Sequence, residues 1–172
     1  MDRDGVLNDA VVVAGRPYPP SNLDEVKLAD GVEEGCRALK HAGFLLIGIT
    51  NQPDVARGKT DRKVVEEINR FLMARLGIDS FQVCYHDDSD DCDCRKPKPG
   101  MILVEAERRN IDLQASFMIG DMWKDIEAGK RAGCRTVLID QHYLESSRSE
   151  PTFTVSSFSE AVSAILSGKE EE

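Results

Sequence analysis

Short apolar segments alternate with amphipathic segments along most of this sequence, and that alternation limits the folds it can adopt. The apolar segments are residues 44–49, 81–85, 115–119 and 135–139. The segments with apolar residues at helical spacing are 32–42, 60–76, 101–109, 123–132 and 158–166. Buried strands that alternate with helices predict an α/β fold, with a parallel sheet and helices on both of its faces. The length of 172 residues predicts one domain, residues 1–172.

Polar residues gather where the loops after such strands are expected. The four clusters are Asp2 with Asp4, Thr50 with Asn51 and Gln52, Arg95 with Lys96, and Asp121 with Asp125. Each cluster alone is compatible with a turn or a helix cap. In parallel sheets, however, ligands bind beyond the carboxyl ends of the strands, so four such clusters together predict an active site at that edge.

The residue types in these clusters suit phosphoryl transfer. Clustered carboxylates repel one another, and Mg²⁺ removes that repulsion because it prefers hard oxygen ligands. A carboxylate can attack phosphorus to form an aspartyl-phosphate, and a second carboxyl group can protonate the leaving alcohol and then activate water. Lysine, hydroxyl and amide groups can stabilise the phosphoryl oxygens.

The pattern resembles the haloacid dehalogenase (HAD) superfamily of phosphotransferases. Its four motifs correspond here to Asp2-Arg3-Asp4-Gly5, Thr50, Lys96 and Gly120-Asp121-x-x-x-Asp125. The resemblance implies a Rossmann-like three-layer sandwich, with Asp2 as nucleophile and Asp4 as general acid/base. It also implies that Thr50 and Lys96 hold the phosphoryl group. Mg²⁺ would be bound by the Asp2 side chain, the Asp4 backbone carbonyl and Asp121, with Asp125 in support.

A separate metal signal lies at about residues 84–94. Cys84 and His86, and likewise Cys92 and Cys94, are two residues apart, so each pair lies on one side of an extended chain. Three thiolates and one imidazole make a closed tetrahedral zinc set, which is typical of a structural site. The alternative is a chance cluster of buried thiols, which the many aspartates of this loop disfavour. We expect the zinc to fix the loop that carries Arg95 and Lys96.

The zinc loop and the segments around Asp2 and Thr50 are together similar to one HAD branch, the phosphatases of heptose bisphosphates and of histidinol phosphate. The resemblance implies substrate contacts from Thr50, Asn51, Gln52 and Arg95. It implies removal of the 7-phosphate of D-glycero-D-manno-heptose 1,7-bisphosphate, without a large cap domain. Histidinol phosphate or another small phosphomonoester is an alternative substrate, and a zinc-stapled scaffold protein without catalysis is an alternative function. Arg57 is a candidate for a second phosphate, although a solvated loop explains it almost as well.

Charge and composition narrow the possible partners and the possible location of the protein. The chain has 31 acidic and 22 basic residues, a net charge of −9, which disfavours nucleic acid as a partner. No apolar stretch is long enough to cross a membrane or to form a signal peptide. We expect a cytoplasmic monomer that binds a small phosphorylated sugar, because neither a heptad pattern nor an apolar interface is evident.

The segment before the first motif departs from the family pattern. In HAD proteins an apolar strand in the middle of the sheet precedes the nucleophile, whereas here only Met1 precedes Asp2. Either upstream residues were lost or another segment fills the gap, and we expect loss. Unpaired neighbouring strands and exposed core surface then predict impaired stability and low activity.

Overall fold

The structure, a computed structural model, describes residues 1–143 and 150–168. Its α-helices are α1 (Val32–His41), α2 (Arg62–Leu76), α3 (Gly100–Arg109), α4 (Trp123–Ala132) and α5 (Phe158–Ser167). Its strands are β1 (Val11–Val13), β2 (Arg16–Tyr18), β3 (Ile47–Asn51), β4 (Ser80–Cys84), β5 (Phe117–Gly120), β6 (Arg135–Ile139) and β7 (Phe153–Val155). Two short 3-10 helices, η1 (Leu23–Glu25) and η2 (Asp88–Asp90), complete the elements.

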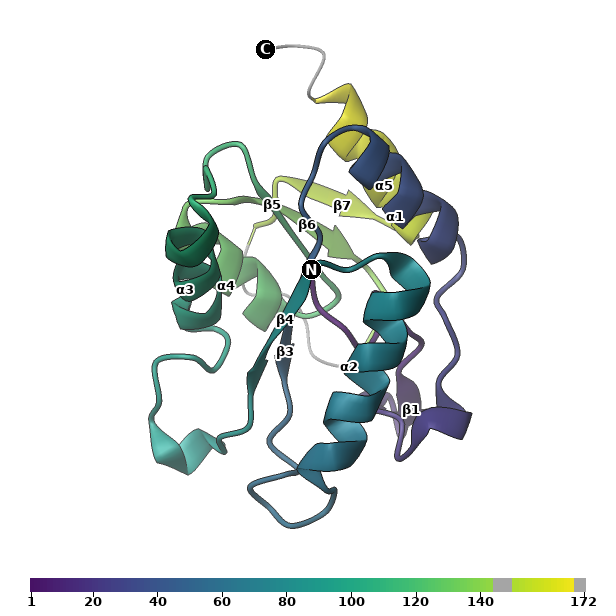
Figure 1. The fold of residues 1–172 in the computed structure, drawn as a ribbon, viewed down its shortest axis with the longest axis vertical. Coiled ribbons are helices and arrows are strands. Elements are labelled where there is room, and N and C mark those ends of the chain that lie inside the picture. The colour runs from purple at the N-terminus through teal and green to yellow at the C-terminus, as the bar shows by residue number, and fades with distance from the viewer. Residues whose placement is uncertain (144–149, 169–172) are drawn as a thin grey trace.

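The helices form three layers with the strands, which confirms the predicted α/β sandwich (Figure 1). One core lies between the strands and α1, α2 and α5, and it includes Leu72, Val137 and Ile165. The other core lies between the strands and α3 and α4, and it includes Met101 and Ala128. Among the described residues, no helix is both long enough and apolar enough to span a bilayer.

The sheet is divided into two parts rather than continuous. Strands β3 and β4 pair in parallel, with Ile47 opposite Ser80, and β5, β6 and β7 form a separate parallel group. Met1 lies against β3, since its ammonium donates to the carbonyl of Ile47 at 2.8 Å and its own carbonyl accepts from the amide of Ile49 at 2.8 Å. The amide of Asp2 donates to the carbonyl of Ile119 on β5, also at 2.8 Å. Met1 and Asp2 therefore lie between the two parts and hydrogen-bond to both.

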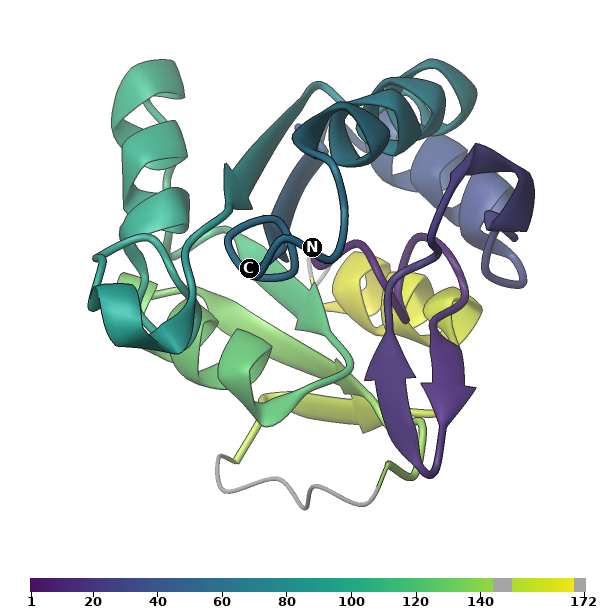
Figure 2. The ribbon, with the colours of Figure 1, turned by 90° about the horizontal axis from the view of Figure 1, so that it is seen from below.

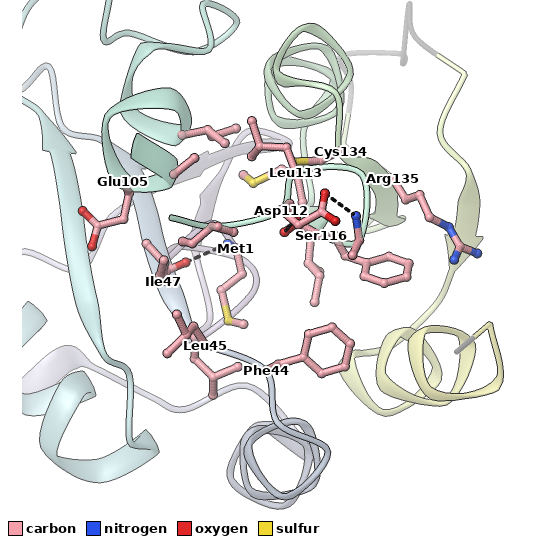
Figure 3. A pocket seen from close by; sticks show the side chains of 18 of the residues that line it. Met1, Phe44, Leu45, Ile47, Glu105, Asp112, Leu113, Ser116, Cys134 and Arg135 are labelled. Carbon is pink, nitrogen blue, oxygen red and sulfur yellow. Dashed lines mark hydrogen bonds between the residues drawn. The ribbon is translucent and has the colours of Figure 1, made fainter. Parts of the chain in front are cut away.

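An apolar cavity of about 400 Å³ lies between β3 and β5 beside Met1. Figure 3 shows Phe44, Leu45 and Leu113 among the side chains around it, with Arg135 at one side. The cavity contains none of the predicted catalytic or metal-binding side chains. Leu45 is half exposed, because the sheet does not continue across this gap.

Two strands differ from the prediction. Residues 44–46 were expected in a strand, but β3 begins at Ile47, because residues 44–46 come before the point at which Met1 and β4 supply partners. Strand β7 was not predicted, since three residues are too few to show a pattern. Strand β1 pairs with β2 as an antiparallel hairpin (Figure 2).

Candidate active site

The polar clusters from the carboxyl ends of the strands meet in one cleft of about 320 Å³. Every residue predicted to act in catalysis, to bind substrate or to bind magnesium lines this cleft: Asp2, Asp4, Thr50, Asn51, Gln52, Arg57, Arg95, Lys96, Asp121 and Asp125. Pro17 and Tyr18 of the β1–β2 hairpin border the same cleft. The topology thus brings together residues that are up to 123 positions apart in the sequence.

Lys96 lies between two carboxylates at the bottom of the cleft. Its ammonium is 2.7 Å from Asp2 and 2.5 Å from Asp125, and it donates to the backbone carbonyl of Ile49 at 2.8 Å. Burial opposes its charge, but the charges of Asp125 and Asp2 outweigh that effect and raise the pKa of Lys96. The lysine is therefore a fixed cation beside the Asp2 carboxylate.

Among the described residues, Lys96 and the nearby Tyr143 favour the charged form of Asp121, whereas burial and the neighbouring acids oppose it. Both of its carboxylate oxygens are buried and lack a hydrogen-bond partner among the described residues. Oxygens of Asp2, Asp121 and Asp125 all lie within 4.8 Å of one another. Burial first, and then the charges of Asp2 and Asp125, raise the pKa of Asp121 well above its usual value. Burial likewise raises the pKa of Asp2 to about 6, against the opposing charge of Lys96.

This group of carboxylates fits a hard divalent cation, because the positive charge of such a cation would balance the negative charge of the buried Asp121 oxygens. Asp125 is bound differently from Asp121. One of its oxygens contacts Lys96, and the other accepts from the backbone amide of Met122 at 3.0 Å. Asp125 therefore holds the loop at the start of α4 in place.

Asp4 has a partner set of its own. Its carboxylate accepts from Arg3 Nε at 3.1 Å and Arg3 Nη2 at 2.9 Å, and from Asn8 Nδ2 at 3.0 Å. The Gln52 amide donates to Asp4 at 2.8 Å and to the Thr50 hydroxyl at 2.9 Å. Arg3 and Asn8 were not predicted as site residues, although both belong to the Asp-Arg-Asp-Gly-Val-Leu-Asn motif. Gln52, predicted to contact substrate, is buried and links Asp4 to Thr50.

Asn51 joins the loop after β3 to the loop that carries Lys96. Its amide donates to the backbone carbonyl of Lys96 at 3.0 Å, and its carbonyl oxygen accepts from the Lys96 amide at 3.1 Å. These two hydrogen bonds fix the backbone of Lys96 and, with it, the position of the buried ammonium group.

The predicted substrate-binding arginines lie at the rim of the cleft and are paired with acids. Arg57 contacts Asp87 and Asp54, and Arg95 contacts Asp88 at 2.7 Å. Hydrogen bonding to Arg57 lowers the pKa of Asp87 to about 2. Since Asp87 and Asp88 belong to the 84–94 loop, that loop determines where both guanidinium groups lie. The sequence analysis assigned no role to the rim residue Lys124, which adjoins the predicted Asp125.

Cys84, His86, Cys92 and Cys94 form a compact cluster beside the rim. The sulfur atom of Cys84 is 3.7 Å from that of Cys92, and the sulfur atom of Cys94 is 3.2 Å from that of Cys84 and 3.4 Å from that of Cys92. His86 Nδ1 lies 3.2 Å from the sulfur of Cys94. A tetrahedral site with metal–sulfur bonds of about 2.3 Å has edges of about 3.8 Å, so the cluster fits one tetrahedral metal ion.

The comparisons with known proteins agree with this geometry. Residues 93–161 match a hydrolase-like family model described as HAD-hydrolase-like. The fold and the cleft define a phosphatase of the HAD superfamily, which confirms the resemblance seen in the sequence.

The individual relatives identify the branch. D-glycero-beta-D-manno-heptose-1,7-bisphosphate 7-phosphatase of Pasteurella multocida is 36% identical in an alignment of 151 residues, and the match covers 81% of this chain and 79% of that protein. The enzyme of the same name from Escherichia coli K12 is 33% identical over 81% of this chain and 76% of its own length. The chain belongs to the heptose bisphosphate phosphatase family of HAD phosphatases.

Solved structures show the same relationship. D,D-heptose 1,7-bisphosphate phosphatase from B. bronchiseptica, complexed with magnesium and phosphate, superimposes with a TM-score of 0.82 at 28% identity. That superposition covers 97% of this chain and 96% of the other. The phosphatase of the same kind from Burkholderia thailandensis gives a TM-score of 0.65 at 25% identity, over 96% of each chain.

Proposed function

We propose that this protein hydrolyses a phosphomonoester through an aspartyl-phosphate on Asp2. The arrangement of Asp2, Lys96 and Asp121 carries the proposal. It places a carboxylate nucleophile beside a fixed cation and beside Asp121, whose buried oxygens accept no hydrogen bond within the described part of the chain. Such a site can neutralise the charge of a phosphate dianion while a carboxylate attacks it.

The residues around Asp2 divide the remaining work. Asp2 attacks phosphorus, the bond to the leaving oxygen breaks, and Asp4 gives its proton to that oxygen. Asp4 then takes a proton from the water that hydrolyses the aspartyl-phosphate. The Thr50 hydroxyl and the Lys96 ammonium hold the phosphoryl oxygens during both steps.

Two metal ions complete the proposed site. Asp2, Asp121 and the Asp4 backbone would hold Mg²⁺, with Asp125 in support, and the ion would offset the phosphoryl charge. Cys84, His86, Cys92 and Cys94 would hold a structural Zn²⁺, since four protein ligands leave no open position. The zinc site would fix the loop whose acids position Arg57 and Arg95.

The proposed substrate is D-glycero-D-manno-heptose 1,7-bisphosphate, from which the 7-phosphate is removed. The names of the relatives support this substrate, and so does the rim of the cleft. A bisphosphate needs cations for its second phosphate, and Arg57, Lys59, Arg95 and Lys124 line the cleft around the buried lysine. Histidinol phosphate has one phosphate and a cationic amine, so it offers no second phosphate for these cations to contact.

The test is phosphate release with Mg²⁺ from both anomers of the heptose bisphosphate and from histidinol phosphate, measured in parallel. The Asp2→Asn variant is the control for adventitious phosphatase. We expect release from the heptose substrate that disappears in the variant. Preference for histidinol phosphate would overturn the substrate, and release that survives Asp2→Asn would overturn the nucleophile. Retention of zinc without any phosphate release would favour the scaffold alternative.

We further propose that residues 1–172 act as one cytoplasmic domain and as a monomer. Light scattering after gel filtration tests the monomer, for which a mass of 19.1 kDa is expected.

A further inference from the structure

We propose that Asn69 on α2 is a positioning residue for Asp4 and that it acts through Arg3. The inference rests on the proposed acid/base role of Asp4. Asn69 does not line the cleft, and the sequence analysis gave it no role. Its carbonyl oxygen accepts from Arg3 Nη1 at 3.0 Å, across 66 residues of sequence.

Both residues of this contact are buried. Arg3 is fully buried and Asn69 is 5% exposed. Asn69 occupies the buried face of α2 with Val65, Ile68 and Leu72, where an apolar side chain would otherwise be expected. A buried guanidinium needs acceptors for its N–H groups, and Asp4 and Asn69 supply them.

The guanidinium orients Asp4 without competing with it for a proton. Arginine stays protonated at every working pH, so Arg3 donates to the carboxylate through Nε and Nη2 but takes no part in proton transfer. Asn69 fixes the third nitrogen of the same planar group and thereby sets the plane in which the guanidinium meets Asp4. A general acid must point at the leaving oxygen, and a small misplacement lowers the rate of proton transfer.

The dependence of the rate on the leaving group distinguishes this role from a merely structural one. When the bond between phosphorus and an alkyl oxygen breaks, the electron pair on that oxygen takes the proton of Asp4. The p-nitrophenolate group leaves without a proton. A variant with a misplaced Asp4 therefore slows cleavage of the alkyl phosphate but not the initial burst of p-nitrophenol from p-nitrophenyl phosphate.

The test compares Asn69→Leu, which removes the acceptor at similar volume, with Asn69→Asp, which keeps an oxygen there. General acid catalysis contributes about 10²- to 10⁴-fold, and for Asn69→Leu we expect about a tenfold loss of kcat on heptose bisphosphate. We expect KM and the p-nitrophenol burst rate to change less than about twofold. The variant Asn69→Asp restores most of the lost kcat. The exposed neighbour Arg70 gives the control Arg70→Ala, which leaves all these rates unchanged.

Equal loss with both substrates, or no loss with either, overturns the inference. If Asn69→Leu fails to fold, the variant Arg3→Lys keeps the positive charge but removes the planar guanidinium group. The same dependence of the rate on the leaving group is then expected. If the wild type prefers another alkyl phosphate, the same comparison with that substrate still tests Asn69, although the proposed substrate has failed. A wild type that cleaves no alkyl phosphate overturns both proposals.

Discussion

The variant Asp121→Asn tests the electrostatics of the cleft directly. In the absence of a cation, Asp121 is a buried carboxyl group close to Asp2 and Asp125, and its oxygens accept no hydrogen bond from residues 1–143 or 150–168. Its replacement by a neutral amide removes two repulsions and one attraction to Lys96. We therefore expect the variant to be more stable than the wild type when both are free of magnesium, which is the opposite of the usual effect of a buried substitution.

The size of the effect follows from the distances. Oxygens of the three acids all lie within 4.8 Å of one another, and at that separation two unit charges repel by about 3.5 kcal/mol at an effective dielectric constant of about 20. The two repulsions, less the attraction to Lys96, leave a net repulsion equal to about one such pair in the wild type. Imperfect hydrogen bonding of the new amide offsets part of the stability gained when this repulsion is removed. A net gain of about 2 kcal/mol corresponds to a rise in Tm of about 4–8 °C for a protein of this size.

Thermal unfolding in buffer freed of magnesium by ion exchange, without a chelator that would strip zinc, gives the comparison. At pH 8 we expect the Tm of Asp121→Asn to exceed that of the wild type, and Mg²⁺ to raise only the wild type. The native pKa of Asp2, about 6, exceeds its ordinary value of 3.8, so metal-free wild type loses stability as the pH rises through that interval. The difference between the two proteins should shrink at pH 5. An equal or lower Tm for the variant at pH 8, or equal stabilisation of both by Mg²⁺, would refute this reasoning.

Three further predictions concern the framework. Asp79 accepts hydrogen bonds from the Leu46 amide and from Lys40, and these contacts lower its pKa. Asp79→Asn should therefore cost about 1–2 kcal/mol at pH 7, and urea titrations should show that cost disappearing as the pH falls through the lowered pKa. The exposed Asp24→Asn should change nothing. Cys92→Ser should abolish stoichiometric zinc in metal analysis and raise KM more than it lowers kcat, because the loop holds the rim arginines. Leu72→Ala should cost about 2–5 kcal/mol in chemical unfolding, against under about 1 kcal/mol for the partly exposed Phe71→Ala.

The helices and the longer strands were predictable because the helices repeat their apolar residues at helical spacing and those strands are mostly apolar, whereas β7 is too short to show a pattern. The site residues were predictable by type, since a parallel sheet collects the loops after its strands at one edge. Their partners were not predictable. Arg3 and Asn69 are 66 residues apart and meet only through the packing of α2, and the sequence alone does not show that Gln52 turns inward to Asp4. The sequence also does not show that Met1 and Asp2 hydrogen-bond to both β3 and β5.

The split sheet gives the active-site charges a second, mechanical role. Lys96 hydrogen-bonds to β3, and its ion pairs reach Asp2 and Asp125 on the side of β5. The ion pairs of the cleft thus fasten two halves that share no continuous backbone ladder. A ligand that contacts both halves of the sheet adds to this connection between them. Amide hydrogen exchange in β3 and β5 should therefore slow together when the cleft is filled, although the ligand touches only their ends.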